Sequence, residues 1–495
     1  MINMYSLSLN NTELDFKTLE RIIYKTVCDI ACDSLKDVLE RLDLMLLAQR
    51  DPNEYRNKGF RKTSIHTVMG TIEYKRRIYE TRDENGRKNY IYLLDKYLKN
   101  ETIGRVSSNL AEKIVERVLE EPYRKTAQAI GNLTNKELSH TAVWNVVQAI
   151  GEKLEAQEKK KIINYQQGKT NGEREVKVLF QEADGVWLSM QGKDRPKSGK
   201  NKKRELKLAV NYEGWKKREG QKEGYVVHNK TACTGFYDSR TFKELWDATV
   251  AEKYNTDEIE VRIINGDGAP WIKAGLGEEG FHFQLDPFHI SKAIVKNVPN
   301  KKQANKLKKL FRRGEIDKGF EILTELLIQY NEEQDTFKKL EDLYNYLARN
   351  REGLKPYHLR GIKLPDPPVG LEYRTLGTME HNVCDIVALR MKGRKMSWSV
   401  KGANFLAKLL ASRASGNLYA KLEMLLDDTV SEEKLEEVIE VVQLSAAQVN
   451  RKPKKSKFYK IHESPIPFTG KAVTEGRKAI QRLVKNRVAS ELVYR

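Results

Sequence analysis

The stretch VKVLFQEADGVWLSM, residues 176–190, constrains the fold of this chain more than any other segment. It is short, apolar, and rich in β-branched and aromatic residues, which predicts a buried β-strand rather than a helix. Asp184 lies in the middle of this run. Because burying a carboxylate is costly unless a cation meets it, we expect Asp184 to belong to a functional site on a sheet.

Later apolar runs predict the partners of this strand. They are ELKLAV (205–210), GYVVHN (224–229), EIEVRIINGDGAP (258–270) and FHFQLDPFHISKAI (281–294). A helix from Thr241 to Lys253 separates the second and third of them. The third run ends on an acid, Asp267. Two strands that each carry an aspartate in their C-terminal part favour a shared metal site.

The charge balance indicates a polyanionic partner. The 495 residues include 89 Lys and Arg against 69 Asp and Glu, a net charge of +20. This surplus favours nucleic acid over an anionic membrane, because no stretch approaches the roughly 20 apolar residues of a spanning helix. The alternative is a basic soluble protein without a nucleic-acid partner. A chain of this length predicts two to four domains.

The four cysteines do not predict a zinc site. Cys28, Cys32, Cys233 and Cys384 form no CxxC pair and no cluster with histidine at zinc-ligand spacing. The first residues, MINMYSLSLNNTELDF, lack the basic segment and apolar core of a signal peptide. Both observations fit a reducing cytoplasm.

Residues 1–165 are predicted to form a mainly helical N-terminal DNA-binding region with a small β unit. An amphipathic helix spans 13–48, and the period changes to two from Ser64. Two strand-like runs then flank the turn at 83–86, which predicts an antiparallel β unit. Lys75, Arg76 and Arg77 in this unit indicate either a solvated edge strand or a DNA contact.

Residues 122–154 resemble a helix-turn-helix. A short helix, a break at Gly131-Asn132 and a second helix capped by Ser139 are expected. In such a motif the first turns of the second helix contact base edges in the major groove. The candidate DNA-contacting residues are His140, Thr141, Asn145 and Gln148. A plain helical hairpin is the alternative.

A polar linker, 164–175, marks a domain boundary, and the first part of an α/β core built on the strands described above is expected over 166–294. The loop between its first two strands is strongly basic, which indicates either contacts with DNA phosphates or a solubilising loop. Its position beside the predicted site favours phosphate binding. The residues concerned are Lys197, Lys200, Lys202, Lys203 and Arg204.

The remaining chain divides into three segments. Residues 295–370 are predicted to be a helical insertion, 371–426 the second part of the core, and 427–495 a C-terminal helix with a basic tail. In the second part of the core, Thr378 is expected to cap a helix whose first turn contains Glu380. By helical spacing Glu380 shares a face with Val383, Cys384, Val387 and Met391, so it is expected to point inward. The alternative is an outward glutamate stabilised by the helix dipole.

The order of these elements is that of a ribonuclease H-like α/β core with a helical insertion. In such a core Asp184, Asp267 and Glu380 would converge. Mg²⁺ prefers oxygen ligands and keeps several waters, so carboxylates can hold it beside a phosphate. Two ions about 4 Å apart can activate the attacking oxygen and stabilise the leaving oxygen of a phosphodiester.

Four blocks carry a resemblance to a known family. QEADGVWLSMQG, INGDGAPWIKAG, LDPFHISKAI and MEHNVCDIVALRMKGRKMSW, in this order, resemble bacterial DDE transposases of the ISLre-type insertion-sequence family, formerly an uncharacterised protein family. The resemblance covers nearly the whole chain, including KGFRKTSIHTVMGTIEYKRRIYE near its start.

The resemblance implies metal-dependent cleavage and strand transfer at the ends of a mobile element. Asp184, Asp267 and Glu380 would be the catalytic residues and the ligands of two Mg²⁺ ions, for which Mn²⁺ would substitute. Asp286 and His289 resemble a D-x-x-H pair of related transposases and would support the site or contact DNA. Glu182, on the same strand face, is the alternative to Asp184.

Two other functions stay open at this point. One is a ribonuclease H-like nuclease or resolvase that does not join strands. The other is a domesticated DNA-binding protein without catalysis. A transposase joins two DNA ends, so a homodimer or a higher assembly on DNA is expected. The expected partner is double-stranded DNA, both at the element ends and at the target.

Overall fold

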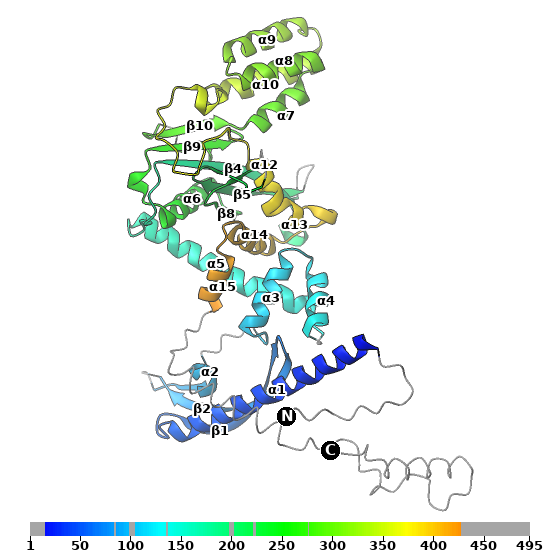
Figure 1. The fold of residues 1–495 in the computed structure, drawn as a ribbon, viewed down its shortest axis with the longest axis vertical. Helices are drawn as coiled ribbons and strands as arrows, with labels where there is room; N and C mark the ends of the chain where they lie inside the picture. Colours follow the sequence, from blue (N-terminus) through cyan, green and yellow to red (C-terminus); the bar gives the residue numbers. More distant parts are fainter. Residues whose placement is uncertain are drawn as a thin grey trace, which may run out of the picture. The chain divides into compact units, whose positions relative to one another are not determined.

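The computed structural model describes residues 15–83, 86–98, 104–134, 137–197, 202–220, 224–275 and 277–426 (Figure 1). The predicted C-terminal helix and basic tail, 427–495, lie outside the described residues. The described chain forms two compact units. The first unit contains the described residues up to 111 together with residues 128–138. The second unit contains residues 112–127 and the described residues from 139 to 426.

The first unit pairs a long helix with a three-stranded antiparallel sheet of order β1-β2-β3. Its elements are α1 (Phe16–Gln49), β1 (Arg56–Thr67), β2 (Gly70–Arg82), β3 (Lys88–Ile91) and α2 (Leu93–Tyr97). Val38, Leu39 and Leu42 of α1 form a buried cluster with Ile72 and Tyr74 of β2. The predicted helix and antiparallel unit are confirmed, with β1 beginning eight residues before Ser64.

The basic triplet in β2 is not on an edge strand. β2 is the central strand, and Arg77 is buried and ion-paired with the buried Asp43 of α1. Arg76 pairs with Asp95 of α2. Only Lys75 is exposed. The prediction of a solvated edge strand is therefore wrong, because two of the three cations neutralise acids within the unit.

The second unit is built on a mixed five-stranded sheet of order β10-β9-β4-β5-β8. Its strands are β4 (Val178–Ser189), β5 (Lys203–Tyr212), β8 (Thr231–Gly235), β9 (Val261–Gly266) and β10 (Phe281–Leu285). β4, β9 and β10 are parallel, whereas β5 runs antiparallel to both β4 and β8. The first seven residues of β4 are all buried, as expected for a strand covered on both faces.

The third strand of this sheet differs from the prediction. Residues 225–227 form β7 (Tyr225–Val227), which pairs only with β6 (Trp215–Lys217) in a separate hairpin. The sheet partner of β5 is β8, whose sequence TACTG has small and hydroxylated residues. These residues give a weak strand signal, because β-propensity reflects packing against neighbours more than an intrinsic preference.

Two helices, α6 (Ser239–Lys253) and α14 (Val400–Ala414), pack against the sheet. α5 (His140–Gln166) packs on both of them, and α15 (Leu418–Leu426) packs on α5 and α14. Phe242, Leu245 and Trp246 of α6 share one buried cluster with Ala183 of β4 and Ala209 of β5. α6 confirms the helix predicted over 241–253.

Two features predicted for residues 122–154 have different outcomes. Ser139 caps α5, since its side chain accepts a hydrogen bond from Ala142 N (3.1 Å). The break at Gly131-Asn132 is wrong, because α4 (Tyr123–Thr134) continues through both residues. α5 also extends to Gln166, into the start of the predicted linker, and belongs to the second unit. The helix before α4 is α3 (Ser108–Val118).

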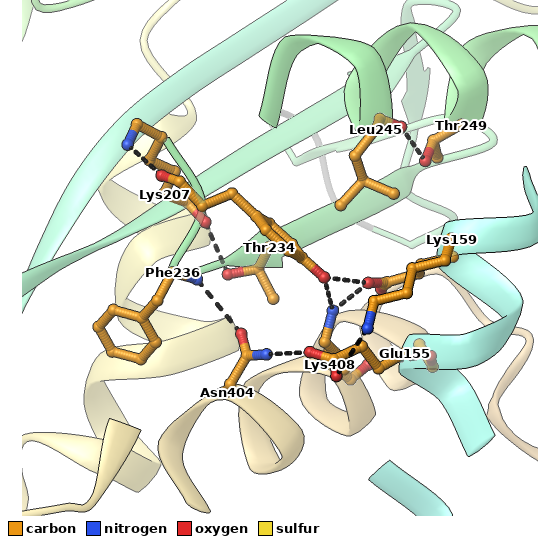
Figure 2. Close-up of polar contacts among 12 residues, drawn as sticks. Glu155, Lys159, Lys207, Thr234, Phe236, Leu245, Thr249, Asn404 and Lys408 are labelled. Atoms are coloured by element: carbon orange, nitrogen blue, oxygen red, sulfur yellow. Dashed lines mark hydrogen bonds and ion pairs between the residues drawn. The ribbon is translucent and has the colours of Figure 1, made fainter. Parts of the chain in front are cut away.

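A buried polar cluster joins α5, α14 and the end of β8 (Figure 2). Asn404 of α14 accepts from Phe236 N (3.2 Å) and donates to Glu155 of α5 (3.2 Å). One turn later, Lys408 of α14 pairs with Glu158 of α5. Lys408 is 2% exposed, so this ion pair fixes α14 against α5 inside the protein.

β10 leads into α7 (Pro287–Asn297), the helix predicted to follow that strand. The predicted helical insertion comes next and comprises α8 (Lys301–Arg312), α9 (Ile316–Gln329), α10 (Gln334–Arg349) and the short α11 (Arg351–Leu354). Leu307, Leu323 and Leu343 of these helices belong to the same buried cluster as Phe283 and Leu285 of β10. Among the described residues, no helix is both long and apolar enough to cross a bilayer.

Candidate acidic site where the parallel strand pairing ends

The strand register places three aspartates at one level. Ala183 is the register partner of Gly266, which is also the partner of Leu285. The next residues along the three parallel strands are Asp184, Asp267 and Asp286. Neighbouring strands lie about 4.8 Å apart, so these backbone positions are close. The expected meeting of Asp184 and Asp267 at one edge of the sheet is supported by this register.

His289 joins this group through the first turn of α7. Its Nε2 lies 3.6 Å from Oδ2 of Asp184. Asp286 is the N-cap of α7 and accepts from Phe288 N (2.9 Å), which fixes the turn that carries His289. Burial opposes protonation of the imidazole, but the hydrogen bond and charge of Asp184, with the charges of Asp286 and Asp267, raise the pKa of His289.

The carboxylates in this site repel one another. Burial, with the charge of Asp184, raises the pKa of Asp267, although the hydrogen bond from Ala269 N opposes this. Burial, with the charges of Glu182 and Asp184, raises the pKa of Asp286 to about 6. The site therefore has more negative charge than His289 balances, and such a site attracts a cation.

Glu205 of β5 is an acid that the sequence reasoning missed. Burial and the charges of Asp267 and Asp184 raise its pKa. A Cβ placed on Gly185 would lie 2.0 Å from Oε1 of Glu205, so the Glu205 side chain occupies the space beside Gly185. The glycine within the strand is the sequence signal for this contact, because a strand glycine often marks a close approach.

The helical insertion also contacts the site. Tyr346 of α10 donates a hydrogen bond from its hydroxyl to the carbonyl oxygen of Asp267 (2.9 Å). Burial and the charges of Asp267, Asp286 and Asp184 raise the pKa of Tyr346. The phenol therefore stays protonated and donates to the backbone beside the second acid.

Glu380 does not point inward. It lies in α12 (Met379–Asn382), which continues through the π-helical turn Val383–Ala388 into α13 (Leu389–Met391). Val383, Val387 and Met391 are buried as predicted, but Met379 heads this face, while Glu380 and Cys384 are exposed. A π-helical turn contains more residues than an α-helical turn. Residues four apart, here Met379, Val383, Val387 and Met391, therefore stay on one face of the helix.

The cap of this helix also differs from the prediction. Thr378 is the N-cap residue, but its side chain makes no capping hydrogen bond within the helix. The carboxylate of the fully buried Glu182 accepts from Thr378 N and Met379 N (both 3.1 Å) instead. The carboxylate of Glu182, the predicted alternative to Asp184, is thus hydrogen-bonded to the start of this helix.

The oxygen donors of this site bear on whether a metal ion fits it. Asp184 and Asp267 supply carboxylate oxygens at neighbouring positions, in a site whose crowded charges favour a cation. Within the part of the chain that the structure describes, no three His, Cys, Asp or Glu side chains are arranged as a complete metal site. The two aspartates fit Mg²⁺, and the exposed Glu380 is not part of their cluster.

The predicted DNA-contacting residues are mostly at the surface. Lys197, Lys202, Lys203 and Arg204 are exposed in and after the loop at the end of β4, and Lys200 lies outside the described residues. On α5, three of the four residues are exposed: His140, Thr141 and Asn145. Gln148 is 7% exposed, so its assignment as a DNA contact is wrong. It follows the buried Val147 and lies on the packed side of α5.

The chain belongs to a protein family whose sequence pattern it matches over most of its length. Residues 9–427 match the family described as "Uncharacterised protein family (UPF0236)", so the protein is a member of it. A UPF0236 protein of Caldanaerobacter subterraneus subsp. tengcongensis is 27% identical over 396 residues, covering 78% of this chain and 75% of the relative. Another from that organism, whose name joins eleven gene designations, is 26% identical over 430 residues (84% and 82%).

A third relative comes from a different genus. The "UPF0236 protein in vanSb 3'region" of Streptococcus gallolyticus is 24% identical over 416 residues, covering 82% of this chain and 84% of the relative.

Proposed function

We propose that this protein is a DNA transposase that cleaves and joins DNA strands at the ends of an insertion sequence, using Mg²⁺ held by Asp184 and Asp267. The observation that carries the proposal is the alignment of Asp184, Asp267 and Asp286, each of which directly follows the last parallel pair between the adjacent strands β4, β9 and β10. Carboxylates of adjacent strands can hold a metal ion, and two such ions promote in-line displacement at phosphorus.

The sheet order supports the proposal of a ribonuclease H-like core. Numbered along the chain, its five strands lie in the order 3-2-1-4-5, and the second strand is antiparallel to its neighbours. The first acid lies on the central strand, the second follows the fourth strand, and the helix with Glu380 contacts β4. This is the order of elements expected for that core. In this proposal Glu380, which is exposed and lies outside the cluster of the two aspartates in the structure, joins them as the third ligand when Mg²⁺ binds.

The residues around the two aspartates have defined roles in this proposal. Asp286 holds the first turn of α7, and that turn places His289 beside Asp184. The raised pKa of His289 favours its charged form, which can donate to a DNA phosphate next to the acids. Tyr346 fixes the backbone of Asp267 through its hydrogen bond to the carbonyl oxygen.

A basic surface begins next to the site and supports DNA as the substrate. α7 starts at Asp286, and the exposed side chains of α7, α8 and the residue after α8 include many cations. These are Lys292, Lys296, Lys301, Lys302, Lys306, Lys309, Arg312 and Arg313. No acidic side chain of the described chain forms an ion pair with any of them. Unpaired cations of this density bind phosphates by releasing counterions.

The relatives offer a separate line of support. One UPF0236 protein carries eleven gene designations of a single organism in its name. Many copies of one gene in a genome are what a DNA segment that moves and copies itself produces. We expect the gene of the present chain to lie on such a mobile segment. The ends of that insertion sequence would be the DNA substrate of the protein.

The test is a cleavage assay on DNA that natively flanks the gene, with Mg²⁺ or Mn²⁺. We expect the full-length protein to cut at defined ends and to join them to a target. Asp184→Asn should abolish cleavage and retain DNA binding. Asp335→Asn, the same chemical change at an exposed position of α10, is the matched control and should cleave normally.

Three other outcomes would change the assignment. Cleavage without joining would identify a nuclease or resolvase. DNA binding without cleavage by the wild type would identify a non-catalytic DNA-binding protein. Equal cleavage by the wild type and Asp184→Asn would refute the proposed site.

A further inference from the structure

Glu182 is a buried carboxylate without a cationic partner. It is fully buried, and no Lys, Arg or His among the described residues forms an ion pair with it. A lone buried charge of this kind is costly unless hydrogen bonds compensate for it. Glu182 lies two residues before Asp184, on the same face of β4. The groups that compensate for its charge therefore also indicate how the region around Asp184 is built.

Hydrogen bonds from three parts of the chain compensate for this charge. Tyr212 of β5 donates its hydroxyl (2.5 Å) and Asn265 of β9 donates its amide (2.8 Å). The other donors are Thr378 N (3.1 Å), Met379 N (3.1 Å) and the Thr378 hydroxyl. Burial and the charge of Glu182 raise the pKa of Tyr212, so the phenol stays a donor.

The groups from Thr378 and Met379 form the start of the helix that carries Glu380. A carboxylate is favoured there because it accepts from backbone N–H groups that lack partners within the helix. Charged acceptors make hydrogen bonds about twice as strong as neutral ones. Strand β4 therefore supplies Asp184 directly and fixes the first turn of the Glu380 helix through Glu182.

The chain before this helix has other anchors. Trp215 and Glu372 exchange two backbone hydrogen bonds (3.0 and 2.9 Å), and the Tyr357 hydroxyl donates to Arg374 O (2.8 Å). These contacts hold residues 372–374 against the β6–β7 hairpin and Tyr357 independently of Glu182. Removing the Glu182 charge is therefore expected to release the first helical turn without releasing the segment before it.

We infer that Glu182 is a positioning residue for Glu380, acting through the amides of Thr378 and Met379 to set the third proposed metal ligand relative to Asp184. This inference rests on the proposed function for the role of Glu380. The contact itself is independent of that role. A glutamine at position 182 keeps the shape of the side chain but loses its charge, and it turns an NH₂ group toward donors.

The test compares Glu182→Gln with the wild type in two measurements that need no cleavage. In metal-free full-length protein, amide hydrogen exchange should become at least about 10-fold faster in peptides covering 378–382. In calorimetric titrations with Mn²⁺ alone, the affinity should fall by about 10- to 100-fold, the usual effect of losing a group that orients a ligand.

Two controls separate positioning from general destabilisation. Glu213→Gln alters another buried carboxylate of the sheet unit, which Arg174 and Asn229 contact, and should leave Mn²⁺ affinity unchanged. Thr378→Val removes the hydroxyl that donates to Glu182 and accepts from Asn382 Nδ2 (3.2 Å), and it should weaken Mn²⁺ binding. Thr378→Ser keeps this hydroxyl and should not weaken binding.

The double variant decides whether Glu182 acts through Glu380. If it does, Glu182→Gln should cause no further loss of Mn²⁺ affinity in a Glu380→Gln background, because effects through one group are not additive. Additive losses, unchanged exchange at 378–382, or absence of Mn²⁺ binding by the wild type would each overturn the inference. Weakened Mn²⁺ binding together with a wild type that never cleaves DNA would support the inference and refute the transposase.

Discussion

Replacing Asp286 with asparagine should stabilise the protein at pH 8 but not near pH 4. Asp286 is 2% exposed, and its pKa is raised from 3.8 to about 6 by burial and by the charges of Glu182 and Asp184. Each pKa unit corresponds to about 1.4 kcal/mol, so the ionised carboxylate costs the native state up to about 3 kcal/mol at pH 8.

The sign of the pH dependence follows from the raised pKa. The native state binds the Asp286 proton more tightly than the unfolded chain does. This contribution to stability is present in full below pH 3.8 and is lost as the pH rises to about 6. Asparagine has no such proton, and it is as good an N-cap as aspartate for the hydrogen bond from Phe288 N. Asp286→Asn should therefore equal the wild type near pH 4 and exceed its stability by up to about 3 kcal/mol at pH 8.

Urea unfolding in EDTA, followed by tryptophan fluorescence, measures this difference. All six tryptophans lie in the second unit, so their fluorescence reports on the unit that contains Asp286. Asp335→Asn on the exposed surface of α10 is the control and should show no change with pH. A stability difference for Asp286→Asn that is the same at pH 4.5 and pH 8 would refute the reasoning.

Three further predictions concern the second unit. Lys408→Met should lower the free energy of unfolding by about 3 kcal/mol or more, because it leaves the Glu158 carboxylate without its cation. The double variant with Glu158→Gln should lose less unfolding free energy in the same urea assay. Gly151→Ala should cost about 1–3 kcal/mol in thermal unfolding, because its Cβ would lie 2.3 Å from a side-chain atom of α14. Lys306→Ala with Arg312→Ala should reduce the slope of log affinity for DNA against log salt by about 2, with equal loss for all DNA sequences. An unchanged slope would show that DNA does not bind α8.

The strands that carry the acids could be predicted from the sequence because their signals are local. The run around Asp184 and the run ending at Asp267 are apolar and β-branched, and both are parallel strands of the sheet. β8 was missed since its small residues become a strand only through pairing with β5. A pattern within one segment cannot reveal a strand that depends on its neighbour.

The side-chain environment of the acids was harder to predict than their positions. α-Helical spacing placed Glu380 inward, but the π-helical turn and the buried Met379 turn it to the surface. The partners of Glu182 lie 30, 83 and 196 residues away along the chain, so no local pattern indicates that it caps the Glu380 helix. Similarly, only the fold shows that Glu205 fills the space beside Gly185.

The buried cluster that runs from β10 into α8, α9 and α10 has a consequence for how this family can diverge. Leu307, Leu323 and Leu343 share that cluster with Phe283 and Leu285, so the helical block is not a detachable module. A descendant that lost these helices would expose the apolar side of β10 and the backbone of Asp267, which Tyr346 now contacts. Changes of length are therefore expected in the turns between these helices, while the helices themselves are inherited together with the sheet.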